Sequence, residues 1–501
     1  MKVRFSNFNS LLSVVVRTVA LALALGAAVC FSQEQPTPFA TNGWLLPAIS
    51  VSPSDQTWSR TSRRLVSVAY SDGVYLAVWE DYRNAATGAD IYGARITTGG
   101  NVLDPVGIPI SVGSGKQSRP RVAACGGMFL VVWGDSRNAD TGLDVYGCRV
   151  TVSGTLLDPN GLVIAKAAGD QHMPSIAGSA ARWLVVYNHE KDPAYDIYGT
   201  FVEPSGGVIQ PGGFPVCAAS AVQSMSAVGS NGTDFFVAWH DYRNASSRDL
   251  DVYGTRVTAT GSVTNPQGLL IAGAAAAQWF PHVASNGDTF LVTWHDQRNE
   301  TSFMTNTDVY GARISAGGGV MTPNPISISR SKGNQRDPVA AAMGGDYLVV
   351  WTDDRDAATG YDIVGTTLSG AGVAGATNGF PLSQQPFKQD HPTIAAGPNG
   401  QFLVTHWAED TNTSAFKIIA NICYIREPEV VLDQPVVGAN GARLRWTSVP
   451  RLGYRVQAAE AFPAIWRDLD AGFQADSVVS EVLDAAPVSG ARFYRVIRRG
   501  P

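Results

Sequence analysis

The sequence predicts an all-β protein: a seven-bladed β-propeller closed by an N-terminal strand, followed by a small β-sandwich. Three observations carry this prediction. A motif recurs seven times at intervals of 52 to 57 residues, each copy holds four short strand-like runs, and the chain is rich in turn residues. Of 501 residues, 52 are Gly, 28 are Pro and 16% are charged. This composition excludes a disordered, a collagen-like or a small disulfide-framed protein.

The first 32 residues have the pattern of a secretory signal peptide. Lys2, Arg4 and Arg17 accompany an apolar run over residues 19–31, which is shorter than a membrane span and is followed by polar residues. We therefore expect a secreted protein, extracellular, periplasmic or at the cell surface, and both ordinary and lipoprotein-type cleavage stay open. We expect no membrane span after this segment. The net charge of −5 gives no reason to expect a nucleic-acid partner.

The repeats extend over residues 65 to 424. In each copy an apolar run ends in an aromatic side chain, at Trp79, Trp133, Tyr187, Trp239, Trp294, Trp351 and the pair His406 and Trp407. This second run does not alternate in polarity, as expected for a strand buried on both faces between neighbouring blades. Four antiparallel strands repeated seven times indicate a propeller, since ring closure removes the edges that an open sheet would expose.

Ring closure can be predicted from the two ends of the repeat region. The seventh copy stops near residue 426 without a fourth run, while residues 43–52 resemble an isolated fourth run that precedes the first copy. We therefore predict that this N-terminal strand completes the last blade, which gives a propeller over residues 43–424.

Residues 429–501 lack the repeat and show about six short strands, typical of a small β-sandwich. We expect its large aromatic side chains to form the core rather than a ligand platform, because so small a unit needs them inside: Trp446, Tyr454, Trp466, Phe493 and Tyr494. The cysteines after the signal peptide are widely spaced, so we expect buried apolar residues rather than disulfides at Cys125, Cys148, Cys217 and Cys423.

The motif WEDYRNAATGADIYGARI returns as WGDSRNADTGLDVYGCRV and WHDYRNASSRDLDVYGTRV. It resembles the repeats of secreted bacterial β-propeller proteins and is distantly similar to the repeats of the Tol-system periplasmic propeller. The tail, with its RLRW, YRVQAA and FYRV segments, is similar to fibronectin type III-like modules. These resemblances imply the fold, but the families include binding proteins, scaffolds and enzymes.

The repeated Asp-x-Arg-Asn sequence, first seen at Asp81 to Asn84, is better explained as a structural element than as an active site. A single active site needs its residues once, whereas this set recurs in five blades. We expect the carboxylate and guanidinium to tie the loop ends together. The alternatives are a ring of shallow lectin-like sites or oxygen ligands for Ca²⁺. We expect no cofactor and no bound metal, with Ca²⁺ as the exception to test.

Residues that differ between blades are better candidates for binding. Alternating strand direction places the loop between the second and third strands on the same face as the connection between blades. The candidates on this ligand-binding face are Arg119, His172, His189, His240, Trp279, Phe280, His282, His295, Arg336, Asp337, Asp390 and His391. A metal site formed by His240, His295 and His282 is an alternative to simple packing of these rings. We assign no catalytic residue.

The sequence therefore favours a non-enzymatic binding or scaffold propeller. Its expected partner is a carbohydrate, such as a polysaccharide, or a surface protein, and we expect a monomer. The alternative is an extracellular polysaccharide-degrading hydrolase or lyase with its site on the same face.

Overall fold

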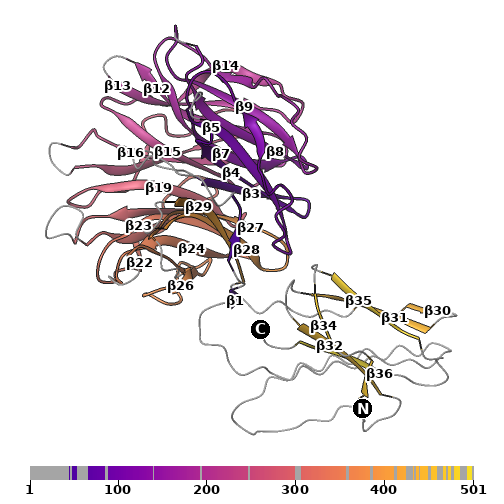
Figure 1. The fold of residues 1–501 in the computed structure, drawn as a ribbon. Coiled ribbons are helices and arrows are strands. Elements are labelled where there is room, and N and C mark those ends of the chain that lie inside the picture. Colours follow the sequence, from indigo (N-terminus) through magenta and orange to yellow (C-terminus); the bar gives the residue numbers. More distant parts are fainter. Residues whose placement is uncertain are drawn as a thin grey trace. The chain divides into compact units, whose positions relative to one another are not determined.

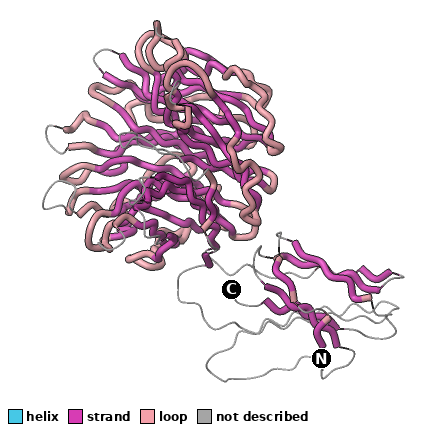
Figure 2. Tube along the Cα trace, viewed as in Figure 1, coloured by secondary structure: helices cyan, strands magenta, loops and turns pink. Residues whose placement is uncertain are grey.

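The computed structural model describes residues 44–45, 48–52, 66–84, 88–138, 140–191, 194–245, 249–299, 306–356, 360–383, 388–410 and 415–424. In the C-terminal part it describes residues 433, 436–438, 441–448, 453–459, 467–469, 472–475, 479–485 and 493–498. All regular secondary structure in these ranges is β-strand (Figure 2). The chain forms two compact units, Thr41–Glu427 and a second unit of Met1–Ala40 with Pro428–Pro501. The predicted signal peptide lies outside the described residues.

The larger unit is a seven-bladed β-propeller, as predicted, with one antiparallel sheet for each repeat (Figure 1). Blades one to six each have four strands, hydrogen-bonded in chain order. Their strands are β3 Val66–Ser71, β4 Val74–Asp81, β5 Asp90–Thr97 and β6 Ile108–Ser111; β7 Gln117–Cys125, β8 Met128–Asp135, β9 Asp144–Thr151 and β10 Leu162–Ala165; β11 Gln171–Gly178, β12 Trp183–Lys191, β13 Ala194–Val202 and β14 Val208–Cys217; β15 Gln223–Ser230, β16 Phe235–Asp241, β17 Asp251–Val257 and β18 Leu269–Ala272; β19 Gln278–Ser285, β20 Thr289–Asp296, β21 Asp308–Ser315 and β22 Ile326–Ser329; β23 Gln335–Met343, β24 Asp346–Asp353, β25 Asp362–Leu368 and β26 Phe380–Ser383.

Blade seven is completed by the N-terminal segment, which confirms the predicted closure. It contains β27 Lys388–Ala396, β28 Gln401–Asp410 and β29 Ala415–Tyr424. Two short strands, β1 Trp44–Leu45 and β2 Ile49–Ser50, pair antiparallel with β29. The backbone continues this pairing, because Val51 N–H donates to the Ile418 carbonyl and Ser52 Oγ accepts from Ile418 N–H.

Blades one and seven are also joined directly, through the buried side chain of Gln401. The Tyr75 hydroxyl donates to Gln401 Oε1 at 2.8 Å, and Gln401 Nε2 donates to the Thr98 carbonyl at 2.9 Å. A polar amide at this position therefore links the last blade to the first and satisfies its own buried groups.

Apolar faces of neighbouring blades form the core. Leu76 and Val78 of blade one, for example, share one cluster with Phe129 and Val131 of blade two. The second strands are buried along nearly their whole length, as their unbroken apolar sequence predicted. The four cysteines of the propeller are buried and free, so the expectation of apolar rather than bridging roles is confirmed for them.

The smaller unit contains two antiparallel sheets. One is built from β30 Val436–Gly438, β31 Gly441–Thr447 and β35 Val479–Asp484, and the other from β32 Gly453–Ala459, β33 Arg467–Asp468, β34 Phe473–Gln474 and β36 Phe493–Arg498. Trp446, Tyr454 and Tyr494 are buried, whereas Trp466 and the Phe493 side chain lie outside the described part. The Tyr494 hydroxyl donates to Asp484 across the two sheets at 3.1 Å. The sandwich fold of this tail stays a prediction.

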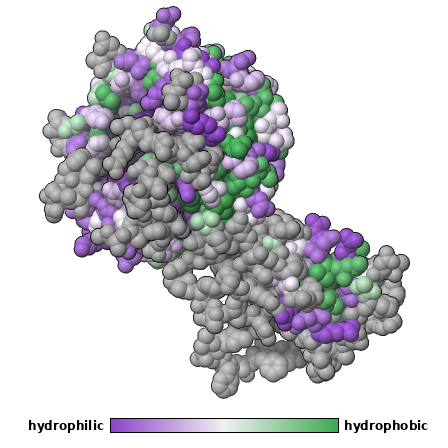
Figure 3. Space-filling model, viewed as in Figure 1, coloured by the Kyte–Doolittle hydropathy of each residue, from purple (hydrophilic) through white to green (hydrophobic). Residues whose placement is uncertain are grey.

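Hydrophilic and hydrophobic residues are interspersed over the visible described surface of the propeller (Figure 3). Within the described residues, no helix is long and apolar enough to cross a membrane.

Candidate functional site

A β-bulge interrupts the first strand of blades two to seven at the same position. The register shifts there, and the first residue of the bulge has a left-handed backbone with φ between 48° and 57°. Outside glycine this conformation costs about 1–2 kcal/mol, so the fold imposes it on whichever side chain is present. We call these six residues the mouth ring: Arg119, Met173, Met225, Phe280, Asp337 and His391.

The mouth ring lines a central channel of about 560 Å³, enclosed by the first strands of all seven blades. Two positions further along each strand is the middle ring: Ser67, Arg121, Ser175, Ala227, His282, Val339 and Thr393. A third ring holds only alanine and glycine: Ala69, Ala123, Ala177, Gly229, Ala284, Ala341 and Ala395. Chemical variety is therefore concentrated in the first two rings, since the third is uniformly small.

Four charged side chains of blades six and seven meet at the mouth ring. His391 Nδ1 lies 2.9 Å from Asp337 Oδ2 and 3.5 Å from Asp390 Oδ1. Arg336 Nη2 donates to Asp390 Oδ2 at 3.0 Å, and the Thr352 hydroxyl donates to Asp390 Oδ1 at 3.0 Å. We call Arg336, Asp337, Asp390 and His391 the charged cluster. The Asp337 and His391 side chains are 21% and 20% exposed, so a molecule in the channel can reach them.

Each partner of the His391–Asp337 pair favours the charged form of the other. Burial by itself raises the pKa of Asp337, but the charge and hydrogen bond of His391, with the charges of His295 and Arg336, lower it below its usual range. Burial likewise lowers the pKa of His391, but the Asp337 and Asp390 carboxylates outweigh burial and raise it. The site therefore contains an imidazole held close to its protonated state beside an ionised carboxylate.

The ligand atoms of Asp337, Asp390 and His391 lie within 4.8 Å of one another, a spacing that could hold a metal ion. The charges argue for a different use. Arg336 already pairs with Asp390, and a raised pKa on His391 opposes the neutral ring that a metal requires. Two carboxylates facing one guanidinium and one imidazolium form a charge-balanced set.

A second group, which we call the aromatic cluster, adjoins the charged cluster and consists of His240, Trp279, Phe280 and His295. The Trp279 and Phe280 rings stack with centroids 6.1 Å apart, and Phe280 is 5.3 Å from His295. His240 is 6.0 Å from Trp279. The Asp337 N–H donates to His295 Nδ1 at 3.4 Å, which connects the two clusters.

Burial lowers the pKa of both His240 and His295 to about 4, so these rings are neutral near pH 7. Since His295 Nδ1 accepts a hydrogen bond, its proton is on Nε2. That atom and Trp279 Nε1 have no hydrogen-bond partner among the described residues. Buried donors normally have partners, so these two N–H groups are exceptions to the usual pattern.

The structure thus brings eight of the twelve candidate residues into two touching clusters on blades four to seven. Arg119 and His282 line the channel in blades two and five. His172 and His189 instead pack edge-on against Tyr195 and Tyr198 of blade three, at 5.0 and 4.7 Å between ring centroids.

Sequence reasoning passed over Glu80, which is buried at the end of β4. Its Oε1 accepts from Arg119 N–H at 2.7 Å and its Oε2 accepts from the Tyr82 hydroxyl at 2.8 Å. Burial raises the pKa of Glu80 despite these hydrogen bonds. The available signal was that Glu80 occupies, in blade one, the position of His240 and His295 in blades four and five.

Sequence reasoning also passed over a glutamine that begins the first strand in blades two to six and takes the second position of β27 in blade seven. Its backbone N–H bonds to the preceding blade's loop, as from Gln117 to the Ala89 carbonyl at 2.9 Å and from Gln171 to Leu143 at 2.6 Å. The loops between second and third strands therefore share a face with the blade connections, as predicted.

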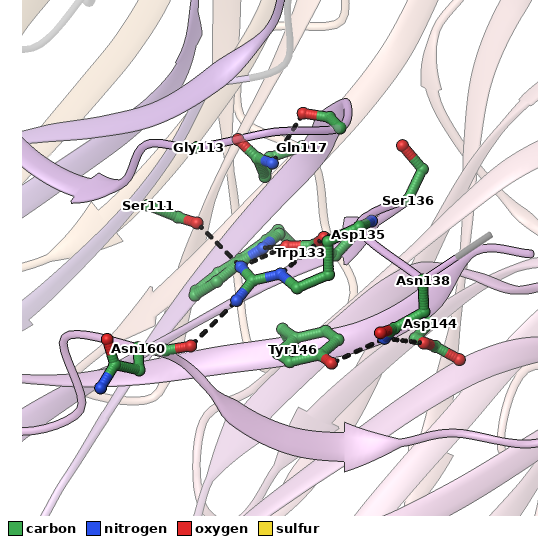
Figure 4. A network of polar contacts seen from close by, with 12 residues as sticks. Ser111, Gly113, Gln117, Trp133, Asp135, Ser136, Asn138, Asp144, Tyr146 and Asn160 are labelled. Carbon is green, nitrogen blue, oxygen red and sulfur yellow. Dashed lines mark hydrogen bonds and ion pairs between the residues drawn. The ribbon is translucent and has the colours of Figure 1, made fainter. Parts of the chain in front are cut away.

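The repeated Asp-Arg pairs are internal ties within each blade. Asp135 accepts from Trp133 Nε1 at 2.8 Å and from the Arg137 backbone N–H and Nε, both at 2.9 Å (Figure 4). Arg137 Nη1 donates onward to the Asn160 carbonyl, and Asn138 donates to Asp144. The same contacts recur at Asp81, Asp241, Asp296 and Asp353. These carboxylates serve the loops, which supports the structural interpretation.

No protein-family model and no curated protein matches the sequence. Among solved structures, the chain is similar to an alpha-L-arabinanase of Penicillium chrysogenum, at 9% identity and a TM-score of 0.47, covering 77% of this chain and 100% of that one. It is also similar to an alpha-L-arabinofuranosidase of Fusarium graminearum, at 10% identity and a TM-score of 0.47, covering 77% and 99%. A thermostable family-43 glycoside hydrolase matches at 10% identity and a TM-score of 0.31, covering 54% and 94%.

The solved structures named above are sugar-cleaving enzymes, which goes against the expectation of a non-enzymatic binding or scaffold protein and against the preference for no enzymatic activity. At 9–10% identity, the likeness itself shows the fold and not the activity of this chain. The mouth ring, where the blades differ, has a shared backbone and six side chains of five different types.

Proposed function

We propose that the protein is a polysaccharide-degrading hydrolase whose reaction centre is the charged cluster at the channel mouth. The observation that carries this proposal is the 2.9 Å contact between His391 Nδ1 and Asp337 Oδ2. Hydrolysis of a glycosidic bond needs a proton donor at the leaving oxygen. A histidine with a raised pKa, oriented by a carboxylate, is suited to that role.

The contact also decides which ring atom transfers the proton. Asp337 engages Nδ1, so Nε2 of His391 is the atom that acts toward a sugar bound in the channel. Asp337 fixes the ring and stabilises its charged form, while Arg336 binds Asp390 and fixes the second carboxylate. The aromatic cluster offers ring faces on which a sugar can stack.

Other parts of the proposal rest on the sequence. We infer secretion through the N-terminal 32 residues, a monomeric propeller over residues 43–424, and a fibronectin type III-like tail over residues 429–501. The distant similarity to the Tol-system propeller belongs to the same inference. The inferred partner is a polysaccharide, which fits an enzyme that works outside the cytoplasm.

The test is release of reducing ends from a panel of plant and microbial polysaccharides by the purified protein. We expect His391→Gln and Asp337→Asn to lower the rate about 10²-fold or more on any substrate cleaved. Asp158→Asn is the matched control, because it breaks a similarly buried ion pair with Arg149 outside the channel. Equal activity in all three variants would refute the assigned centre. An unsaturated product would show elimination and contradict a hydrolase.

A further inference from the structure

Below the charged cluster, the channel contains a guanidinium group that forms no ion pair with the described residues. Arg121 belongs to the middle ring, and its Nη1 donates to the Pro120 carbonyl at 3.3 Å. Among the described residues, no Asp or Glu forms an ion pair with it. The loop arginines differ, since Arg83, Arg137 and Arg298 each bind an aspartate at 2.6 Å.

The pKa of Arg121 shows that its positive charge is destabilised at this position. Burial, and then the charge of Arg119, lower its pKa to about 10, although Glu80 acts in the opposite direction. A buried cation without a partner destabilises a protein, so its presence in a channel lining calls for an anion supplied from outside.

His282 provides a second donor in the same ring. The Ala340 N–H donates to His282 Nδ1 at 3.2 Å, which leaves the proton of the neutral ring on Nε2. Ser67 accepts from Val122 N–H in the same way, so this contact between blades is a feature of the ring. Burial, and then the charge of Arg121, lower the pKa of His282 to about 4.

The remaining members of the middle ring leave room around these two donors. Ser67, Ser175 and Thr393 carry hydroxyl groups, Ala227 and Val339 are small, and the next ring is alanine and glycine. An anionic group entering from the mouth would therefore meet Arg121, His282 and hydroxyls. Arg119 at the mouth adds a further positive charge.

We propose that the channel binds the carboxylate or sulfate group of a sugar, with Arg121 as the principal ligand and His282 Nε2 as a second donor. The substrate class is then an acidic polysaccharide, a conclusion that rests on the proposed hydrolase function. A guanidinium binds carboxylate and sulfate oxygens through paired N–H groups, so it discriminates against neutral sugars.

The experiment is titration calorimetry of the full chain with trigalacturonate, galactotriose and sodium sulfate. We expect trigalacturonate to bind, and we expect no binding of galactotriose, which has no acidic group. A sulfated galactan trimer, tested in parallel, is the corresponding ligand if the channel binds sulfate groups. Arg121→Gln should weaken binding about tenfold to a hundredfold, whereas Arg121→Lys should retain part of it. Arg182→Gln, which removes a positive charge packed on Phe201 outside the channel, is the control and should bind as the original protein does.

Several outcomes would overturn the inference: equal binding of galactotriose, unchanged binding by Arg121→Gln, or sulfate binding alone. A second readout does not depend on whether the variants fold. The melting temperature of the original protein should rise with trigalacturonate and should not rise with galactotriose. The two proposals can fail separately. Binding of trigalacturonate without cleavage of any polysaccharide refutes the hydrolase alone, and cleavage of neutral glycans unaffected by Arg121→Gln refutes the acidic substrate alone.

Discussion

His391 and Asp337 occupy the same bulge position in adjacent blades and form an ion pair at 2.9 Å, although 54 residues separate them in the sequence. Both have a left-handed backbone, with φ of 52° and 51°. In the other described blades this position holds arginine, methionine or phenylalanine. The same bulge therefore recurs from blade to blade. Among the described mouth-ring residues, only blades six and seven place a carboxylate next to an imidazole.

This ion pair predicts a stability that declines as pH rises. The raised pKa of His391 makes its contribution complete below the unfolded value of about 6.5 and lost as pH rises through the folded value. His391→Gln should therefore lower the free energy of unfolding by about 1 kcal/mol at pH 6 and by less at pH 9. Urea unfolding at the two pH values measures the difference.

The matched variant for this prediction is Asp337→Asn, which removes the other partner. The double variant should cost no more than the larger single change if the two residues act as a pair. Additive losses, or a His391→Gln effect that does not depend on pH, would show that the residues contribute independently.

The propeller could be predicted because the same sequence pattern recurs in each blade. Seven aromatic landmarks at near-constant intervals define the sheets, and the missing fourth run of blade seven identifies residues 43–52 as its complement. The break of that segment into β1 and β2 was not predicted, because the sequence pattern matched one continuous fourth strand.

The site could be predicted only in part. Variation between blades indicated Asp337, Asp390 and His391, but their pairing depends on a bulge that has no glycine to announce it. Arg121 was not singled out, because only the assembled channel shows that it forms no ion pair with a carboxylate among the described residues. Glu80 was not singled out either, because its contact with the Arg119 N–H of the neighbouring blade exists only in the folded protein.

Ring closure predicts different outcomes for two N-terminal truncations. Removing residues 1–52 deletes both strands paired with β29 and the Ser52 hydroxyl that binds Ile418 N–H at 3.0 Å. The exposed edge of blade seven should lower the melting temperature and promote aggregation. Removing residues 1–35 leaves these contacts intact. Light scattering and thermal melts that are the same for both truncations would contradict this role.

The loop ties predict equal losses in different blades. Asp241 and Asp296 are fully buried and each accepts from a tryptophan Nε1, a backbone N–H and a guanidinium. Replacing either by Ala should lower the free energy of unfolding by about 2–4 kcal/mol, because several donors lose their acceptor. Asn at the same positions keeps one acceptor oxygen and should cost less. Unchanged denaturation midpoints for the two Ala variants would overturn the structural role.

The buried histidines predict a loss of stability in mild acid, opposite in sign to the effect of His391. His406 is fully buried at the position of the repeat tryptophan, and burial lowers its pKa to about 4 despite contacts with the Trp407 carbonyl and Asn421 Oδ1, both at 3.2 Å. A lowered pKa means that stability is complete above about pH 6.5 and falls as pH decreases toward 4.

At pH 5 the loss should be about 2 kcal/mol for such a histidine, since the unfolded chain is mostly protonated there and the folded chain is not. His406→Gln should therefore reduce the difference in unfolding free energy between pH 7 and pH 5. His391→Gln is the control and should not reduce it, because the pKa of His391 is shifted in the other direction. The lowered pKa of Asp337 acts only below about pH 4, outside this range. Urea titrations at pH 7 and pH 5 of the original protein and both variants provide the comparison. If the unfolding free energy changed equally between the two pH values in all three proteins, a neutral, buried His406 would be refuted.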